Sequence, residues 1–136
     1  MSRITEELLV DCYHQYGTSR QNWLVGAEFE RLFLRRDGKQ VNYFAKDGVR
    51  DLLTELSTAA HWEPSFEGEN IIGLNGVERA VTLEPGAQVE LAGTPHLKLC
   101  DLAKEAIDNL KEFQDATSHD NMWIALGVTP FERIND

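Results

Sequence analysis

Four glutamates stand inside two stretches of the sequence that are otherwise mostly apolar, small or amide-bearing. Glu28 and Glu30 belong to "VGAEFER", and Glu84 and Glu90 belong to "LEPGAQVELAG". Carboxylates held together in a partly dry site repel one another unless a proton, a basic side chain or a metal ion compensates their charge. An all-oxygen set of three or four carboxylates suits Mg²⁺. The four glutamates are therefore candidates for a divalent-cation site, with Mn²⁺ as an alternative ion.

Two simpler interpretations of these acids remain open. An acidic chain has many carboxylates that only face water, and sequence alternation alone does not separate such a face from a metal site. An ion pair from Arg79, which lies shortly before Glu84, would also remove the need for a metal. Arg31 cannot provide that ion pair, because it is expected on the opposite face of the strand that carries Glu28 and Glu30.

A strand is expected to position the first pair of acids. Residues 22–36 alternate with a period of two, so Glu28 and Glu30 should point to the same side. Both faces of this segment are largely apolar, which favours a place in the interior of a sheet. A turn at Asp37–Gly38 and a returning arm at residues 40–44 predict a hairpin.

The second pair of acids lies in a similar setting. Gln88 and Glu90 alternate with apolar neighbours, and a Pro-Gly turn after Glu84 is expected to bring that acid towards the same region. Two short strands are predicted around the turn at Asn75–Gly76. An apolar strand within residues 121–131 is expected to close the sheet.

Three helices complete the expected fold. The first covers residues 5–16, the second is capped by Asp47, and the third begins at Thr94 and Pro95. The second helix carries one apolar stripe: Val49, Leu52, Leu53, Leu56 and Ala60. The sequence therefore predicts an α+β fold with an antiparallel sheet and packed helices, in a single domain over residues 1–136.

Composition excludes several classes of protein. A formal charge of −10 disfavours a nucleic-acid partner, because such binding depends on Lys and Arg. The apolar runs are far shorter than the ~20 residues that cross a bilayer. We expect a cytoplasmic protein without a membrane partner. Cys12 and Cys100 are too isolated for a CxxC pair and are expected to be reduced thiols in the core, and the spacing of the four histidines predicts no zinc site.

An ordered set of motifs resembles the N-terminal part of the plant and proteobacterial type of glutamate-cysteine ligase. The similarity extends from Leu8 to Phe131 and is densest at residues 83–95, which resemble that family's Leu-Glu-Pro-Gly-Gly-Gln-Phe-Glu-Leu-Ser-Gly-Ala-Pro stretch. The motifs are "VGAEFERLFL", "WEPSFEGENIIGLNGVERAVTLEPGAQVELAGTP" and "WIALGVTPF". The differences within the dense stretch are Ala87 for Gly, Val89 for Phe, Ala92 for Ser and Thr94 for Ala.

This resemblance implies a glutamine-synthetase-like sheet and an ATP-dependent ligase. In that family ATP phosphorylates the γ-carboxylate of glutamate, and the amine of cysteine then displaces phosphate to form γ-glutamylcysteine, the first step of glutathione synthesis. Carried over by motif, Glu28, Glu84 and Glu90 are the expected Mg²⁺ ligands. Glu30 is expected either to support these ligands or to face the substrate. Gln88, on the face of Glu90, is a candidate to orient a ligand or a substrate carboxylate, with a purely structural amide as the alternative.

Length is the main departure from the family. Its members are a few hundred residues longer, and the basic residues expected to hold ATP and glutamate lie in the part that is absent here. We therefore expect an N-terminal segment or short relative of the ligase that contributes Mg²⁺-binding carboxylates and is inactive alone. The alternative is a non-catalytic remnant that binds a small molecule or a protein. The apolar closing strand predicts self-association, or pairing with a complementing ligase segment.

Overall fold

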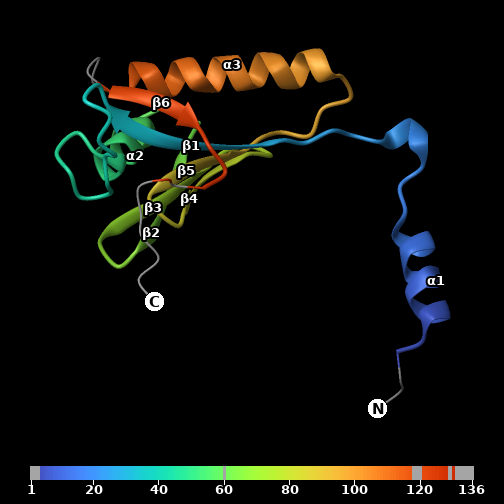
Figure 1. Ribbon diagram of the computed structural model, residues 1–136. Coiled ribbons are helices and arrows are strands. Elements are labelled where there is room, and N and C mark those ends of the chain that lie inside the picture. The colour runs from blue at the N-terminus through green and yellow to red at the C-terminus, as the bar shows by residue number, and fades with distance from the viewer. Residues whose placement is uncertain (1–3, 60, 118–120, 129, 131–136) are drawn as a thin grey trace.

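The computed structural model describes residues 4–59, 61–117, 121–128 and 130. Within them, one antiparallel sheet is covered on one face by two helices (Figure 1). The strands follow the spatial order β2 (Glu63–Glu67), β3 (Asn70–Asn75), β4 (Ala80–Glu84), β5 (Gln88–Ala92), β1 (Glu28–Arg35) and β6 (Asn121–Ala125). The helices are α1 (Glu6–Tyr16), α2 (Val49–Ser57) and α3 (Leu99–Asp115), with a short 3₁₀ turn at Arg20–Asn22. The predicted α+β class with an antiparallel sheet is confirmed.

The strand predicted to be interior does lie inside the sheet. β1 pairs with β5 on one side and with β6 on the other, both antiparallel. The closing strand β6 is shorter than the predicted 121–131 segment and forms an edge of the sheet. Residues 129 and 131 of that prediction lie outside the described residues.

The hydrophobic core lies between the sheet and the helices α2 and α3. Phe33 of β1 stacks on Trp123 of β6 with ring centroids 4.6 Å apart, and Phe113 of α3 packs against Trp123 at 5.3 Å. The predicted stripe of α2 is buried as expected at Val49, Leu52, Leu53 and Leu56, while Ala60 lies outside the described residues. Because side chains alternate along a strand, this core takes one face of the sheet, while the other face carries the glutamates of β1 together with the buried Leu32 and Leu34.

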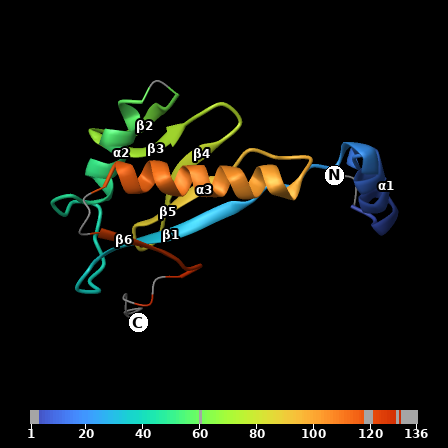
Figure 2. The same cartoon turned by 90° about the horizontal axis from the view of Figure 1, so that it is seen from above.

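The first helix lies away from this core. Thr5, predicted as the first residue of this helix, is its N-cap and accepts a hydrogen bond from Leu8 N at its Oγ1 at 3.2 Å. No residue of α1 is buried, and Figures 1 and 2 show α1 well apart from the sheet. The expectation that both cysteines are core thiols is therefore wrong. Cys12 lies on α1 and Cys100 in the first turn of α3, and both are exposed. Every helix among the described residues is too short or too polar to cross a bilayer.

The predicted start of the third helix is also wrong. The helix begins at Leu99 and not at Thr94, because the intervening segment makes extended contacts. His96 exchanges backbone hydrogen bonds with Val25, and Thr94 N donates to the carboxylate of Glu105 at 3.0 and 3.1 Å. These contacts fix the loop at residues 94–96 to Val25 and to Glu105 of α3, so the helix begins only after this loop.

Two further local predictions fail near the second helix. Gly48, and not Asp47, is the N-cap of α2, because Asp47 has a positive φ of 53°. The predicted returning arm at residues 40–44 forms only an isolated bridge between Gln40 and Leu34. The Asp37–Gly38 turn before it is present, with Gly38 at a φ of 81°.

The hairpins that bring the second acid segment to the sheet agree better with the sequence. β3 and β4 are joined through the predicted turn, closed by a hydrogen bond from Gly76 N to Arg79 O at 2.9 Å. β2, which pairs with β3 at the far edge of the sheet, was not predicted. Its sequence contains Pro64 and two charged residues and lacks clear alternation, which explains the omission.

Candidate metal-binding face

The strand register places all four candidate glutamates on the same face of the sheet, opposite the helices. Glu30 of β1 lies directly across from Glu90 of β5. On the other side of β5, Glu84 of β4 lies across from Gln88, which shares its face with Glu90. Glu28 lies one residue pair further along β1, so Glu28 and Glu84 are both diagonal neighbours of Glu90. Glu90 is the centre of the group.

Electrostatics confirms that these carboxylates lie near one another. The pKa of Glu90 is raised by partial burial, and then by the negative charges of Glu28, Glu84 and Glu30, in decreasing order. Each of the three neighbours thus disfavours the ionised form of the central carboxyl. The repulsion that the sequence implied is present in the folded chain, and a cation placed among these acids would relieve it.

The turn between β4 and β5 brings Glu84 to this face. Gly86 and Ala87 both have a positive φ, of 78° and 57°. A left-handed conformation suits glycine but strains alanine, because its Cβ approaches the following carbonyl oxygen. The strained turn fixes the register in which Glu84 lies opposite Gln88.

Gln88 is held by the protein itself. Its side chain is buried, and Nε2 donates to the carbonyl oxygen of Leu126 at 2.8 Å and to Glu30 Oε2 at 3.4 Å. The segment that follows β6 therefore crosses close to the acids. A Cβ at Gly127 would lie 3.6 Å from Glu30 Oε2, so this segment is also close to Glu30. Nothing in the sequence pattern indicated this contact.

A hollow lies beside the acids where β1 continues past the end of β6. It has a volume of about 610 Å³, and Glu28 and Glu30 form part of its wall. Ile107 and Leu110 of α3 add an apolar side, and Leu126 lies on a third side. A space of this size and mixed character can accept a small molecule next to the carboxylates.

The oxygen donors of this face fit a divalent cation, but the carboxylates lie too far apart in the structure to bind one ion together. Four carboxylates supply only oxygen donors, which Mg²⁺ and Mn²⁺ favour. However, no three His, Cys, Asp or Glu side chains in the described part of the chain are gathered closely enough to hold an ion as they stand. Glu28 and Glu84 are exposed and Glu30 and Glu90 are half-buried, so binding an ion would require these side chains to change rotamer and turn towards one another from a fixed backbone.

The two arginines considered as partners lie elsewhere. Arg31 faces the helices, where its Nη1 donates to Asn109 Oδ1 at 2.8 Å. Arg79 stacks over the ring of Trp62, 4.4 Å from its centroid. In the described part of the chain, neither arginine forms an ion pair with any of the four glutamates. The alternative in which Arg79 neutralises the acids is therefore wrong.

One residue of this face was not singled out from the sequence. Thr82 of β4 lies directly opposite Glu90, so its side chain points to the same face as the acids. The alternation that places Glu84 on the acidic face also applies two residues earlier, and it would have identified Thr82. A threonine hydroxyl is a further oxygen ligand or hydrogen-bond donor.

Comparisons with known proteins point to one family. The family model of glutamate-cysteine ligase family 2 (GCS2) matches residues 24–136. Glutamate-cysteine ligase A, chloroplastic, of Oryza sativa subsp. japonica is 33% identical over 93 residues, which are 68% of this chain and 18% of that protein. The chloroplastic glutamate-cysteine ligase of Solanum lycopersicum is 34% identical over 93 residues, 68% of this chain and 17% of that protein.

A third relative aligns along nearly the whole chain. The chloroplastic glutamate-cysteine ligase of Brassica juncea is 28% identical over 137 aligned positions, which cover 98% of this chain and 26% of that protein. The chain thus spans about a quarter or less of the length of these curated relatives.

Proposed function

Since the chain belongs to glutamate-cysteine ligase family 2, we propose that its acidic face is the cation-binding part of an ATP-dependent ligase that joins glutamate to cysteine. The register of the sheet carries this proposal. It sets Glu90 directly across from Glu30 and diagonally to Glu28 and Glu84, on the face that the helices leave open.

Each acid of this face has a role in the proposal. Glu28, Glu84 and Glu90 hold Mg²⁺, and Mn²⁺ can replace it. The bound ion would supply positive charge that neutralises a phosphoryl group during transfer. Glu30 lies on the substrate side, beside the hollow. Gln88 orients Glu30 through a hydrogen bond from its Nε2 at 3.4 Å.

The partners of the whole ligase are part of the proposal as well. ATP, glutamate and cysteine are the proposed substrates, and γ-glutamylcysteine is the proposed product. The basic groups that would hold ATP phosphates are expected in the large part of the relatives that this chain does not span. The chain alone should therefore give little or no γ-glutamylcysteine. The plant relatives are named as chloroplastic enzymes, and the cytoplasmic location expected for this chain stays a prediction.

A second candidate function is a non-catalytic binding module that keeps this part of the ligase fold. The observation that favours it is the lack of a gathered metal-ligand group in the described residues. Such a module would keep the sheet and its hollow but would not need the four acids to act on one ion.

A chimeric ligase tests the first function against the second. The aligned segment of the Solanum lycopersicum relative is replaced by the corresponding residues of this chain, and formation of γ-glutamylcysteine is measured with ATP, glutamate, cysteine and Mg²⁺. Glu28→Gln, Glu84→Gln and Glu90→Gln should each lower kcat about 100-fold or more. Glu69→Gln, an exposed acid in the turn before β3, is the matched control and should leave kcat unchanged.

Two results would contradict the proposal. One is a chimera in which the three substitutions at the acidic face have no more effect than Glu69→Gln. The other is robust product from the isolated chain, which would show that the separate basic part is not needed.

A further inference from the structure

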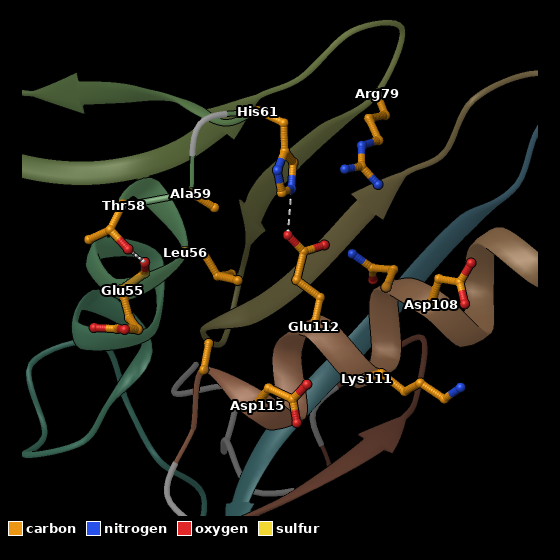
Figure 3. Close-up of a pocket in the computed structure, with 12 residues that line it drawn as sticks. Glu55, Leu56, Thr58, Ala59, His61, Arg79, Asp108, Lys111, Glu112 and Asp115 are labelled. Carbon is orange, nitrogen blue, oxygen red and sulfur yellow. Dashed lines mark hydrogen bonds and ion pairs between the residues drawn. The ribbon is translucent and has the colours of Figure 1, made fainter.

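A pocket of about 660 Å³ opens on the other side of the sheet, between α2, α3 and the turn that leads into β4 (Figure 3). Glu55 of α2, Asp115 and Glu112 of α3, and Arg79 of the turn form much of its polar wall. None of these residues belongs to the acidic face. The pocket is therefore separate from the proposed cation site.

Arg79 is held in place at one end of the pocket. Its guanidinium lies 4.4 Å from the centroid of the Trp62 ring, a cation–π arrangement. Gly76 leaves the room for this stack, because a Cβ there would lie 3.1 Å from both Arg79 Cγ and Trp62 Cζ3. Arg79 forms no ion pair with a carboxylate of the described residues. A positioned cation without an anionic partner is the first requirement of a carboxylate-binding site.

Asn109 adds an unsatisfied donor to the wall of the same pocket. Its side chain is 1% exposed, and its Oδ1 accepts a hydrogen bond from Arg31 Nη1 at 2.8 Å. Because an arginine can only donate, this bond fixes the orientation of the amide. The opposite atom, Nδ2, is buried and has no hydrogen-bond partner among the described residues. A buried donor without an acceptor costs about 1–3 kcal/mol, and an acceptor in the pocket would recover part of that cost once a neighbouring side chain moves to uncover Nδ2.

One carboxylate oxygen of Glu112 already accepts hydrogen bonds from neighbouring side chains. Its Oε1 accepts from Trp62 Nε1 at 2.7 Å and from His61 Nε2 at 2.7 Å, and the second of these contacts is drawn in Figure 3. Glu55 and Asp115, on the helical side, form no ion pair with another described residue. Figure 3 shows Arg79 on the strand side and these two acids on the side of the helices. The pocket thus presents the guanidinium of Arg79 on the strand side, and on the helical side carboxylates that outnumber the one cation there, Lys111.

The overall charge of the lining restricts the ligand. The residues that line the pocket include four carboxylates, namely Glu55, Asp108, Glu112 and Asp115, and only two permanent cations, Arg79 and Lys111. Phosphates and dicarboxylates would be repelled by this surplus of negative charge. A molecule that carries one carboxylate and one ammonium group matches both sides without adding net charge.

We propose that this pocket binds a small zwitterion, of which a free α-amino acid is the simplest. Its carboxylate pairs with the guanidinium of Arg79 and approaches the amide of Asn109. Its ammonium group pairs with Glu55 or Asp115. This site is independent of the proposed cation site, because the two lie on opposite faces of the sheet.

The test is an NMR titration of the full chain with three matched probes, in buffer that contains EDTA. L-alanine carries both charged groups, propionate lacks the ammonium group, and ethylammonium lacks the carboxylate. The indole Nε1–H of Trp62 reports directly, since it donates to Glu112 at the pocket. L-alanine should shift this signal in a saturable way with a Kd of about 1 mM. Propionate and ethylammonium should each bind at least about tenfold more weakly than L-alanine.

Three variants separate binding at this pocket from weak contacts elsewhere. Arg79→Met keeps an unbranched side chain over Trp62 but removes the charge, and it should weaken L-alanine binding about tenfold or more. Arg79→Lys should retain part of the affinity. Arg50→Met is the control, because Arg50 is exposed and pairs with Asp51 away from the pocket. An unchanged, dispersed spectrum shows that each variant is folded.

Several outcomes would overturn the proposal. They are the absence of a saturable shift with L-alanine, an affinity for propionate equal to that for L-alanine, and equal effects of Arg79→Met and Arg50→Met. A loss of binding in Glu28→Gln would also contradict it, because it would move the ligand to the acidic face.

Discussion

Glu30 and Glu90 lie directly opposite each other on adjacent antiparallel strands, with their side chains on the face of the sheet that the helices leave open. Like charges in such a pair normally destabilise a sheet. Here Glu28 and Glu84 add further negative charge around Glu90 and raise its pKa, after the larger effect of burial. A cation bound among these carboxylates would remove this repulsion, and we expect this face to bind one.

The first prediction concerns this pair. Glu30→Gln should stabilise the metal-free chain by roughly 0.2–1 kcal/mol, because it removes a like charge directly across from Glu90. It should also lower the pKa of Glu90, which NMR of the side-chain carboxyl measures. Chemical denaturation at neutral pH measures the stability, with Glu69→Gln as the control. A destabilised Glu30→Gln chain with an unchanged pKa at Glu90 would show that the two acids do not interact.

Much of the acidic face could be predicted from the sequence because strands follow a simple period. Alternation alone set Glu28 and Glu30 on one side and Arg31 on the other, and the structure agrees. The Pro-Gly turn likewise predicted that Glu84 returns towards Glu90. The strand register then places the two pairs of acids together, because residues directly opposite each other on adjacent strands point to the same face of the sheet.

The failures have a common physical cause, which is that tertiary contacts override local patterns. Thr94 followed by Pro95 is a good helix start, yet the backbone of His96 exchanges hydrogen bonds with Val25, and the helix begins only at Leu99. The helix predicted at residues 5–16 is expected to pack on the sheet, but no residue of α1 is buried, and Cys12 is exposed. The contact between Gln88 and the carbonyl of Leu126 depends on where the chain goes after β6, and no local pattern encodes that path.

The turn between β4 and β5 gives the second prediction. Ala87 has a φ of 57°, a conformation that costs a non-glycine residue roughly 1–2 kcal/mol. The motif that this turn resembles has glycine at the corresponding position. Ala87→Gly should therefore stabilise the chain by about 1 kcal/mol, as measured by the midpoint of urea unfolding.

An alanine in regular strand geometry provides the control for that substitution. Ala80→Gly in β4 should destabilise the chain by about 0.5–1 kcal/mol, because glycine loses more backbone freedom on folding. Equal losses of stability in both variants would show that the conformation of Ala87 is not strained.

The third prediction concerns the contact that fixes the loop before α3. Burial by itself raises the pKa of Glu105, but hydrogen bonds from Thr94 and His96 outweigh burial and hold that pKa below its usual value. A carboxyl whose pKa is lower in the folded than in the unfolded state stabilises the folded chain at pH values above its ordinary pKa of about 4.3. This contribution is lost as the pH falls through the lowered pKa of the folded state.

Glu105→Gln should therefore cost roughly 1.5–3 kcal/mol at pH 7, because a charge-assisted hydrogen bond to the carboxylate is lost. The difference from the unsubstituted chain should shrink as the pH falls through the acidic range. Denaturation measured at several pH values gives both curves. A difference that stays constant down to pH values below the ordinary pKa would mean that the charge of Glu105 does not contribute.

The most direct measurement of the central claim is a Mn²⁺ titration of the isolated chain, followed by the paramagnetic broadening of backbone NMR signals. The account predicts that broadening is strongest around β1, β4 and β5, and that Mg²⁺ competes with it. Glu28→Gln, Glu84→Gln and Glu90→Gln should each weaken binding about tenfold or more, while Glu69→Gln should not. Broadening spread over all acidic surfaces, with equal affinity in all four variants, would contradict the claim that this face is a cation site.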